Sequence, residues 1–135
     1  MAVLRSGLPD VVDDKEDLAR FLPSRSLFNS LMAKPAAFMP YKGETSVFRH
    51  GAEPRAELWQ IAKDHALGDR TLHGAAIVRA QHVRGAGLDV VASEPPPRHA
   101  SIIGWVSRPS NPDMEKADRL KQATLIAQQA TLVRP

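Results

Sequence analysis

Apolar and β-branched residues gather in four short runs along the chain, and each run predicts a β-strand. The clearest run, TSVFR at residues 45–49, is rich in strand-forming residues and follows a Lys42-Gly43 turn. The third and fourth runs are separated by the triple proline at residues 95–97, which predicts a stiff, extended loop. The four predicted strands are residues 45–49, 71–80, 88–92 and 99–106.

Two longer segments carry apolar residues at helical spacing. In residues 54–68, Leu58 and Ile61 fall on one face of the predicted helix. Residues 112–130 follow Asn111, a favourable N-cap, and begin with a proline where the first helical turn tolerates one. These segments therefore predict the two principal helices.

Four shorter segments complete the pattern. Acidic residues open residues 13–22 and Pro23 closes them, so this stretch predicts a short helix. Prolines bracket residues 34–40 and favour an extended, edge-like path. Residues 81–85 predict one helical turn, and residues 131–133 predict a short edge strand.

Together these elements predict an α+β fold. The strands are grouped instead of alternating with helices, which favours a small, mostly antiparallel sheet of about four strands with the two main helices on one face. We place a single domain at residues 13–135, after a loose N-terminal arm of residues 1–12. A chain of 135 residues is long enough to bury one independent core.

The composition narrows the class of protein. Hydrophobic residues make up 43% of the chain and charged residues 24%, which is typical of a globular domain. The absence of cysteine excludes disulfide frameworks, thiolate zinc sites and cysteine nucleophiles. The apolar runs are too short to cross a bilayer, and the first residues lack the apolar stretch of a signal peptide. We therefore expect a soluble, cytoplasmic protein without a membrane partner.

Charge is unevenly distributed around a formal net charge of +3. Residues 1–20 hold five acidic and three basic side chains, whereas residues 21–111 hold eleven basic and seven acidic ones. Twelve of the eighteen basic residues are arginine, which suits bidentate contacts to phosphate or carboxylate. Because the arginines are spread along the chain, they favour a small anion site or a partner surface over a nucleic-acid-binding stripe.

Two Arg-His pairs lie at the ends of predicted strands. Arg49-His50 closes the first predicted strand, and Arg98-His99 opens the fourth. If the pairs converge, the arginines could bind a phosphate or carboxylate, with a histidine as acid or base near neutral pH. In the alternative interpretation, both pairs simply mark strand ends that face water.

Metal and cofactor motifs are missing from the sequence. His73 and His82 are nine residues apart, which is not a zinc-ligand spacing, and no HExxH motif is present. The Gly85-Ala86-Gly87 bend leads into a predicted strand instead of a helix, so it does not predict a phosphate-binding loop. We expect no metal and no cofactor.

Two stretches together resemble a group of small uncharacterised bacterial proteins of similar length. They are KPAAFMP at residues 34–40, which leads to SVFR at residues 46–49, and PRHASIIGW at residues 97–105. The resemblance covers residues 17–135 and implies a bacterial protein. It brings no function with it.

The SVFR stretch alone is also similar to the end of the first strand in ADP-ribosyltransferase-like domains, which include NAD-consuming toxins and RNA 2′-phosphotransferases. In those domains an arginine or histidine at this place holds a phosphate. The resemblance implies this role for Arg49 with His50, and a later ligand contact for His73 or His99. The chain departs from the family's pattern because no Ser-Thr-Ser stretch and no placed catalytic glutamate follow, which puts the family's reaction in doubt.

The expected function follows from the features that the sequence has and from those that it lacks. Because no catalytic constellation stands out and the last predicted helix mixes Lys, Arg and Gln, we expect a non-enzymatic accessory or protein-interaction domain of a bacterial multi-protein system. The first alternative is a small enzyme or binder that acts on a phosphate-bearing ligand through the two Arg-His pairs. The second alternative is sequence-independent nucleic-acid binding, with an affinity that falls steeply as salt rises.

Overall fold

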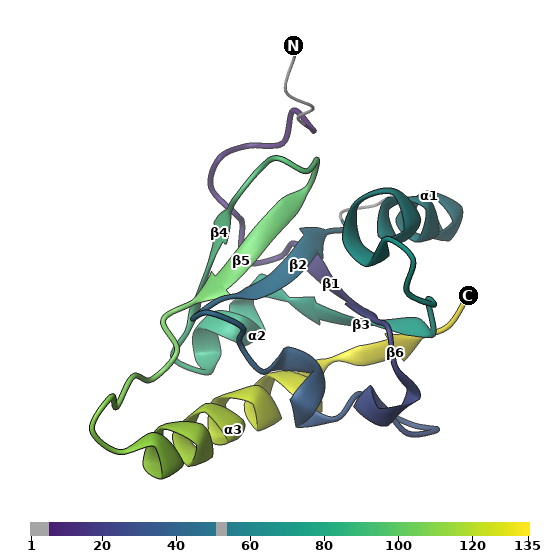
Figure 1. Cartoon of the computed structure of the whole chain (residues 1–135). Coiled ribbons are helices and arrows are strands. Elements are labelled where there is room, and N and C mark those ends of the chain that lie inside the picture. Colours follow the sequence, from purple (N-terminus) through teal and green to yellow (C-terminus); the bar gives the residue numbers. More distant parts are fainter. Residues whose placement is uncertain (1–5, 51–53) are drawn as a thin grey trace.

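A six-stranded antiparallel sheet runs through the part of the molecule that the structure describes, and helices cover both of its faces (Figure 1). The computed structural model describes residues 6–50 and 54–135. Neighbouring strands pair in the order β4-β5-β2-β1-β3-β6, so the first strand of the chain lies inside the sheet and the last lies at an edge. The strands are β1 Asp17–Leu22, β2 Thr45–Arg49, β3 Gly74–Arg79, β4 Asp89–Ala92, β5 His99–Ile103 and β6 Thr131–Val133.

Both principal helices form where the sequence predicts them. α1 (Arg55–Ile61) continues directly into a π-helical segment, η3 (Ala62–Leu67). α3 (Pro112–Gln129) has Pro112 in its first turn, and the Asn111 side chain caps it by accepting a backbone hydrogen bond. The other helical segments of the described residues are η1 (Arg25–Leu27), η2 (Pro35–Phe38) and α2 (Ala80–Gly85).

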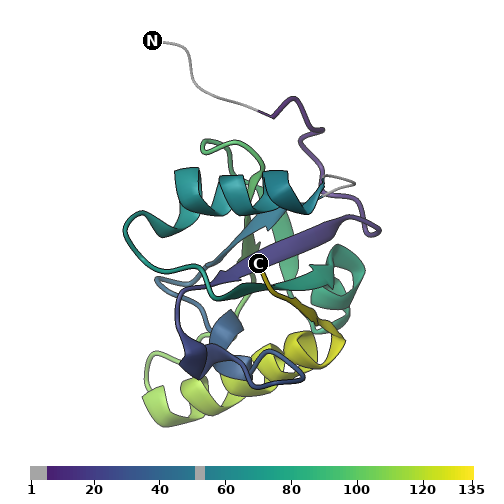
Figure 2. The same cartoon turned by 90° about the vertical axis from the view of Figure 1, so that its right-hand side faces the viewer.

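The sheet has a hydrophobic cluster on each face. α1 and η3 cover one face, which we call the α1 face, while α2, α3 and η2 cover the other, which we call the α3 face (Figure 2). The antiparallel α+β sheet is therefore confirmed, whereas the expectation of helices on one face is wrong, because the central strands carry apolar side chains on both sides. The α1-face cluster contains Ala19, Phe21, Phe48, Leu58, Ala62, Leu67, Ala75 and Val133, and the α3-face cluster includes Leu18, Leu22, Val47, Val78, Ile102 and Ile126.

Residues 13–22 were predicted to form a short helix, and this is wrong. The acidic residues close a turn instead: the Asp13 N–H donates to the Glu16 carboxylate at 2.7 Å, and the Glu16 N–H donates to the Asp13 carbonyl at 3.0 Å. The apolar run that follows is strand β1, with Leu18 facing one cluster and Phe21 the other. A short run buried on both sides has no clear periodicity, so sequence pattern alone cannot separate helix from strand there.

Residues 34–40 also differ from the extended path predicted for them. Pro35 occupies the first turn of η2, where a missing N–H costs nothing, and Phe38 is fully buried in the α3-face cluster. The segments predicted at residues 81–85 and 131–133 are both present, as α2 and β6. The predicted count of four strands and two main helices is too low. The sequence pattern predicts a helix where β1 forms, and the count does not include the short segments α2 and β6.

Candidate functional site

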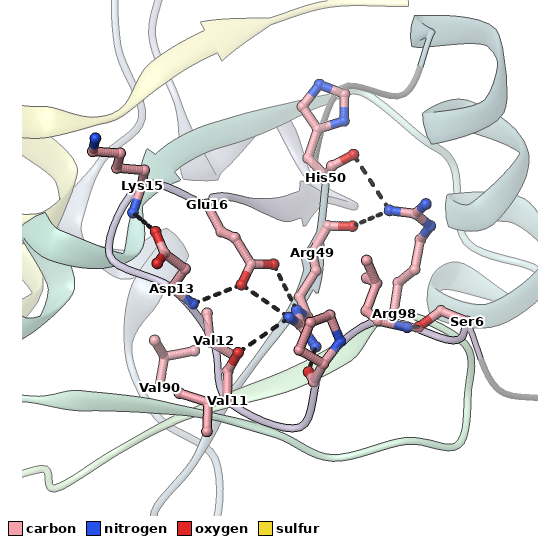
Figure 3. Close-up of polar contacts among 12 residues, drawn as sticks. Ser6, Val11, Val12, Asp13, Lys15, Glu16, Arg49, His50, Val90 and Arg98 are labelled. Carbon is pink, nitrogen blue, oxygen red and sulfur yellow. Dashed lines mark hydrogen bonds and ion pairs between the residues drawn. The ribbon is translucent and has the colours of Figure 1, made fainter.

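Arg49, the arginine expected to hold a phosphate, lies beneath the N-terminal segment (Figure 3). Its side chain is only 1% exposed. Nε and Nη2 donate to the two carboxylate oxygens of Glu16 at 2.8 and 2.9 Å, and Nη1 donates to the Pro9 carbonyl at 2.6 Å. These donors are engaged inside the protein, so an external phosphate would have to displace Glu16.

The N-terminal segment is attached at several points over its described part, residues 6–12. The Ser6 N–H donates to the Glu94 carboxylate at 2.7 Å, and Val12 is buried in the α3-face cluster. Residues 1–5 of the arm expected from the sequence lie outside the described residues.

The two Arg-His pairs lie side by side, but their side chains do not share one pocket. β2 ends where β5 begins, so the Arg49 N–H donates to the Arg98 carbonyl at 2.7 Å. The Arg98 guanidinium donates to the Arg49 carbonyl at 3.0 Å (Figure 3). Because side chains alternate along a strand, Arg49 lies on the α3 face and His99 on the α1 face.

His50 and His73 lie away from His99. His50 lines an open hollow together with His82, Arg55 and Arg79. The Nδ1 atoms of His50 and His82 are buried and have no hydrogen-bond partner among the described residues. His73 precedes β3, and its backbone N–H donates to the Leu22 carbonyl at 3.0 Å. Neither His50 nor His73 lines the hollow that contains His99.

His99 lies at the centre of a chain of serine hydroxyls on the α1 face. Its Nε2 is 2.5 Å from the Ser46 Oγ, and its Nδ1 is 2.6 Å from the Ser93 Oγ and 3.2 Å from the Ser93 carbonyl oxygen. The Ser93 hydroxyl in turn contacts the Ser101 hydroxyl at 3.0 Å. The chain exists because β2 and β5 pair Ser46 with Ser101 and Phe48 with His99.

The neighbours of His99 favour one tautomer. The Ser93 carbonyl can only accept, which favours a proton on Nδ1, while the nearer Ser93 hydroxyl can donate or accept. In that tautomer the lone pair on Nε2 accepts the hydrogen bond from the Ser46 hydroxyl. Phe48 packs against the ring edge to face at 5.3 Å between centroids and holds its orientation.

Two arginines complete the site around this histidine. The pairing of β1 with β2 ends at Ala19 and Phe48. Beyond this pair the Arg20 side chain bridges the two strands. It donates to the Ser46 carbonyl and to the Ala37 carbonyl, both at 2.8 Å. Arg70 follows η3 and donates to the Ala66 carbonyl at 2.9 Å. We call the resulting cavity of about 370 Å³ the arginine hollow, lined by Arg20, Tyr41, Glu44, Ser46, Arg70, His99 and Ser101.

The arginine hollow adjoins a smaller one of about 150 Å³. The two share Arg20, Ser46 and Arg70. The smaller hollow adds apolar side chains, among them Phe48 and Leu67. The combined site therefore offers positive charge and hydroxyl groups beside a small apolar surface.

The electrostatics of the site follow from burial and from the two positive charges. Burial lowers the pKa of Arg20 below its ordinary value, and the charge of the nearby Arg70 lowers it further. Burial also lowers the pKa of His99, while its hydrogen bond to Ser93 and the charge of Glu44 act in the opposite direction without reversing the shift. The site therefore combines a neutral imidazole near pH 7 with two guanidinium groups that repel each other.

Sequence reasoning identified His99 but missed Arg20, Arg70 and Ser46. One signal for Arg20 is present in the sequence: it is the single charged residue inside the apolar run Leu18–Leu22. A charge in such a run is costly unless it has polar partners or a function. Nothing in the sequence marks Arg70, which joins the site only through the path of the chain after η3.

Two features are absent from residues 6–50 and 54–135. Those residues contain no group of three or more His, Cys, Asp or Glu side chains that could hold a metal ion. None of the helices in the same residues has the length and apolar character needed to cross a membrane.

The fold and site define a class: an antiparallel α+β sheet with helices on both faces and an arginine-lined hollow on one of them. No protein-family model, curated protein or solved structure gives a significant match to this chain.

Proposed function

We propose that this protein binds a small phosphate-bearing ligand in the arginine hollow. One observation carries the proposal: Arg20 and Arg70 line the same two hollows, and the hydrogen bonds that both side chains donate go to backbone carbonyls. Two like charges held together at one hollow favour an anion between them.

Five other arginines of the described residues provide a contrast. Within the described residues, ion pairs with carboxylates engage Arg49, Arg79, Arg84, Arg108 and Arg119. No such pair is found there for Arg20 or Arg70. Arginine–phosphate contacts are charge-assisted and frequently bidentate, so these two side chains suit a phosphate group.

The remaining lining groups indicate what else the ligand carries. The hydroxyls of Ser46 and Ser101 can contact a phosphate oxygen, while Glu44 can accept a hydrogen bond from a hydroxyl or amino group. The adjoining apolar surface at Phe48 and Leu67 suits a small apolar or planar group. A phosphomonoester of a small organic molecule has all three of these features.

The test is an NMR titration of the full chain with inorganic phosphate and with phenyl phosphate. We expect saturable shifts at the backbone amides of Ser46 and Ser101. Arg70→Ala removes one charge-assisted contact, worth roughly 1.5–3 kcal/mol, and should weaken binding by about 10- to 150-fold. Arg25→Ala is the matched control, because Arg25 is exposed and lies outside the hollow. Shifts that do not saturate, or equal binding by the two variants, would reject the proposal.

A second candidate function is the protein interaction that the sequence favoured, and it has an observation of its own. The outer face of α3 exposes Met114, Leu120 and Leu125 to 47%, 45% and 50%. Leu120 and Leu125 line one shallow, mainly apolar hollow of this helix, and such a patch can pack against the same patch of a second copy, which is the simplest symmetric partner. We propose self-association through α3 as this second function.

A further inference from the structure

Ser46 is an exposed hydroxyl with a base already in contact. It lines both hollows, and its Oγ is 2.5 Å from the Nε2 of His99. A serine hydroxyl is a weak nucleophile on its own and becomes a strong one when a neighbouring base removes its proton. The distance is short enough for direct proton transfer.

His99 is oriented as such a base requires. The Ser93 carbonyl at 3.2 Å favours a proton on Nδ1, and this tautomer leaves Nε2 free to accept from Ser46. Phe48 on one side and the hydroxyl of Ser93 at 2.6 Å hold the ring in place. Nucleophile, base and orienting group therefore form one hydrogen-bonded series, the arrangement that recurs in enzymes with a serine nucleophile.

The positive charges lie next to this hydroxyl. The Arg20 guanidinium donates to the carbonyl of Ser46 itself at 2.8 Å, and Arg70 lines the same two hollows. Groups that neutralise the oxygens of a transferring phosphoryl group are the main requirement for phosphoryl transfer.

We propose that Ser46 is a nucleophile that accepts the phosphoryl group of a phosphomonoester bound in the arginine hollow, with His99 as its general base. This inference rests on the proposed function. The Ser46 Oγ bonds to phosphorus as its proton passes to His99 Nε2, and the bond from phosphorus to the ester oxygen breaks. The leaving alcohol takes the proton from His99. Water, deprotonated by the same imidazole, then attacks the phosphoserine, releases inorganic phosphate and restores the Ser46 hydroxyl.

The alternative is that the serine–histidine chain only stabilises the pairing of β2 with β5. The two interpretations differ in what His99→Asn and Ser46→Ala should do. A structural role alone predicts a lower melting temperature in both variants and an unchanged reactivity of Ser46 in His99→Asn. A nucleophilic role predicts that His99→Asn loses the reactivity of Ser46 while it remains folded by circular dichroism.

The experiment uses two probes on the full chain. A biotinylated fluorophosphonate reports an activated serine, because the serine displaces fluoride from phosphorus, and the labelled residue is located by peptide mass spectrometry. Release of p-nitrophenolate from p-nitrophenyl phosphate reports turnover. We expect a Ser46 adduct and turnover in the wild type, and at least a hundredfold loss of both in Ser46→Ala and His99→Asn. Ser30→Ala, which removes an exposed serine outside the hollow, should leave both unchanged.

The outcomes separate this inference from the function on which it rests. Saturable phosphate binding without a Ser46 adduct would keep the proposed function and overturn the nucleophile. A Ser46 adduct that persists in His99→Asn at the wild-type rate would also overturn it. A His99-dependent adduct in Arg70→Ala, whose phosphate binding is weakened, would support the nucleophile and show that the adduct forms without the Arg70 contact.

Discussion

Removing the Glu16 carboxylate tests whether the Arg49 ion pair holds the N-terminal segment on the sheet. Glu16→Ala deletes the two hydrogen bonds from Arg49, of 2.8 and 2.9 Å, and the one from the Asp13 N–H, of 2.7 Å, and it leaves a guanidinium that is 1% exposed. Breaking a buried ion pair from one side costs roughly 3–5 kcal/mol, because the remaining charge stays buried. Glu16 is itself 20% exposed, so water can replace part of the loss. We therefore expect a value at the lower end, about 3 kcal/mol.

Thermal unfolding followed by circular dichroism measures this cost. Unfolding entropy is about 2.1 cal/mol/K per residue, or about 0.28 kcal/mol/K for a chain of this length, so the melting temperature should fall by about 10 °C. Asp17→Ala is the control, because its ion pair with Arg79 spans 3.9 Å between side chains that are 41% and 55% exposed. Such exposed pairs contribute up to about 1 kcal/mol. A shift for Glu16→Ala no larger than that for Asp17→Ala would refute the reasoning.

Three further predictions concern pH, the edge of the sheet and α3. Burial alone would raise the pKa of the Glu16 carboxyl, but hydrogen bonds from a guanidinium and a backbone N–H, together with the guanidinium's charge, hold it below its ordinary value. A lowered folded pKa adds stability above the unfolded pKa, about 4.3, and that stability is lost as the pH falls through the folded pKa. The free energy of unfolding, measured in urea, should therefore fall more in the wild type than in Glu16→Gln as the pH drops below about 4.3. Equal losses in the two proteins would contradict this. A Cβ on Gly74 would lie 2.8 Å from the Val133 carbonyl oxygen. Gly74→Ala should therefore lower the free energy of unfolding by roughly 1–3 kcal/mol and speed amide hydrogen exchange in β6. An exchange rate in β6 equal to that of the wild type would contradict the clash. Self-association through α3 predicts a sedimentation coefficient that rises with concentration in the wild type and stays constant in the Leu120→Lys/Leu125→Lys variant; a constant value in both would remove that function.

The parts of the fold that the sequence predicts are those whose signals are local. Residues 45–49 are bounded by a glycine turn, and residues 112–130 carry a cap, a first-turn proline and a long helical period. β1 was missed because a central strand has no local signature of its own. Its partners, β2 and β3, lie tens of residues away, and their pairing decides its conformation.

The candidate site shows the same limit. His99 stood out because it is a histidine at the start of a predicted strand. The other residues of the site come from four separate segments: Arg20 from β1, Ser46 from β2, Arg70 after η3 and Ser93 after β4. Only the antiparallel order of the sheet places Ser46 opposite Ser101 and next to His99. Sequence spacing holds no information about that order.

The conformation of residues 16–20 connects the fold to the site. Glu16 and Arg20 are four residues apart, and on the helix that the sequence predicts they would have formed an ion pair with each other. In an extended strand the same residues lie about 13 Å apart, so each must find another partner. Glu16 neutralises Arg49 and fixes the N-terminal segment, while Arg20 crosses to β2 and remains beside Arg70 without a carboxylate partner in the described residues. The positive charge of the arginine hollow is therefore a consequence of β1 being a strand.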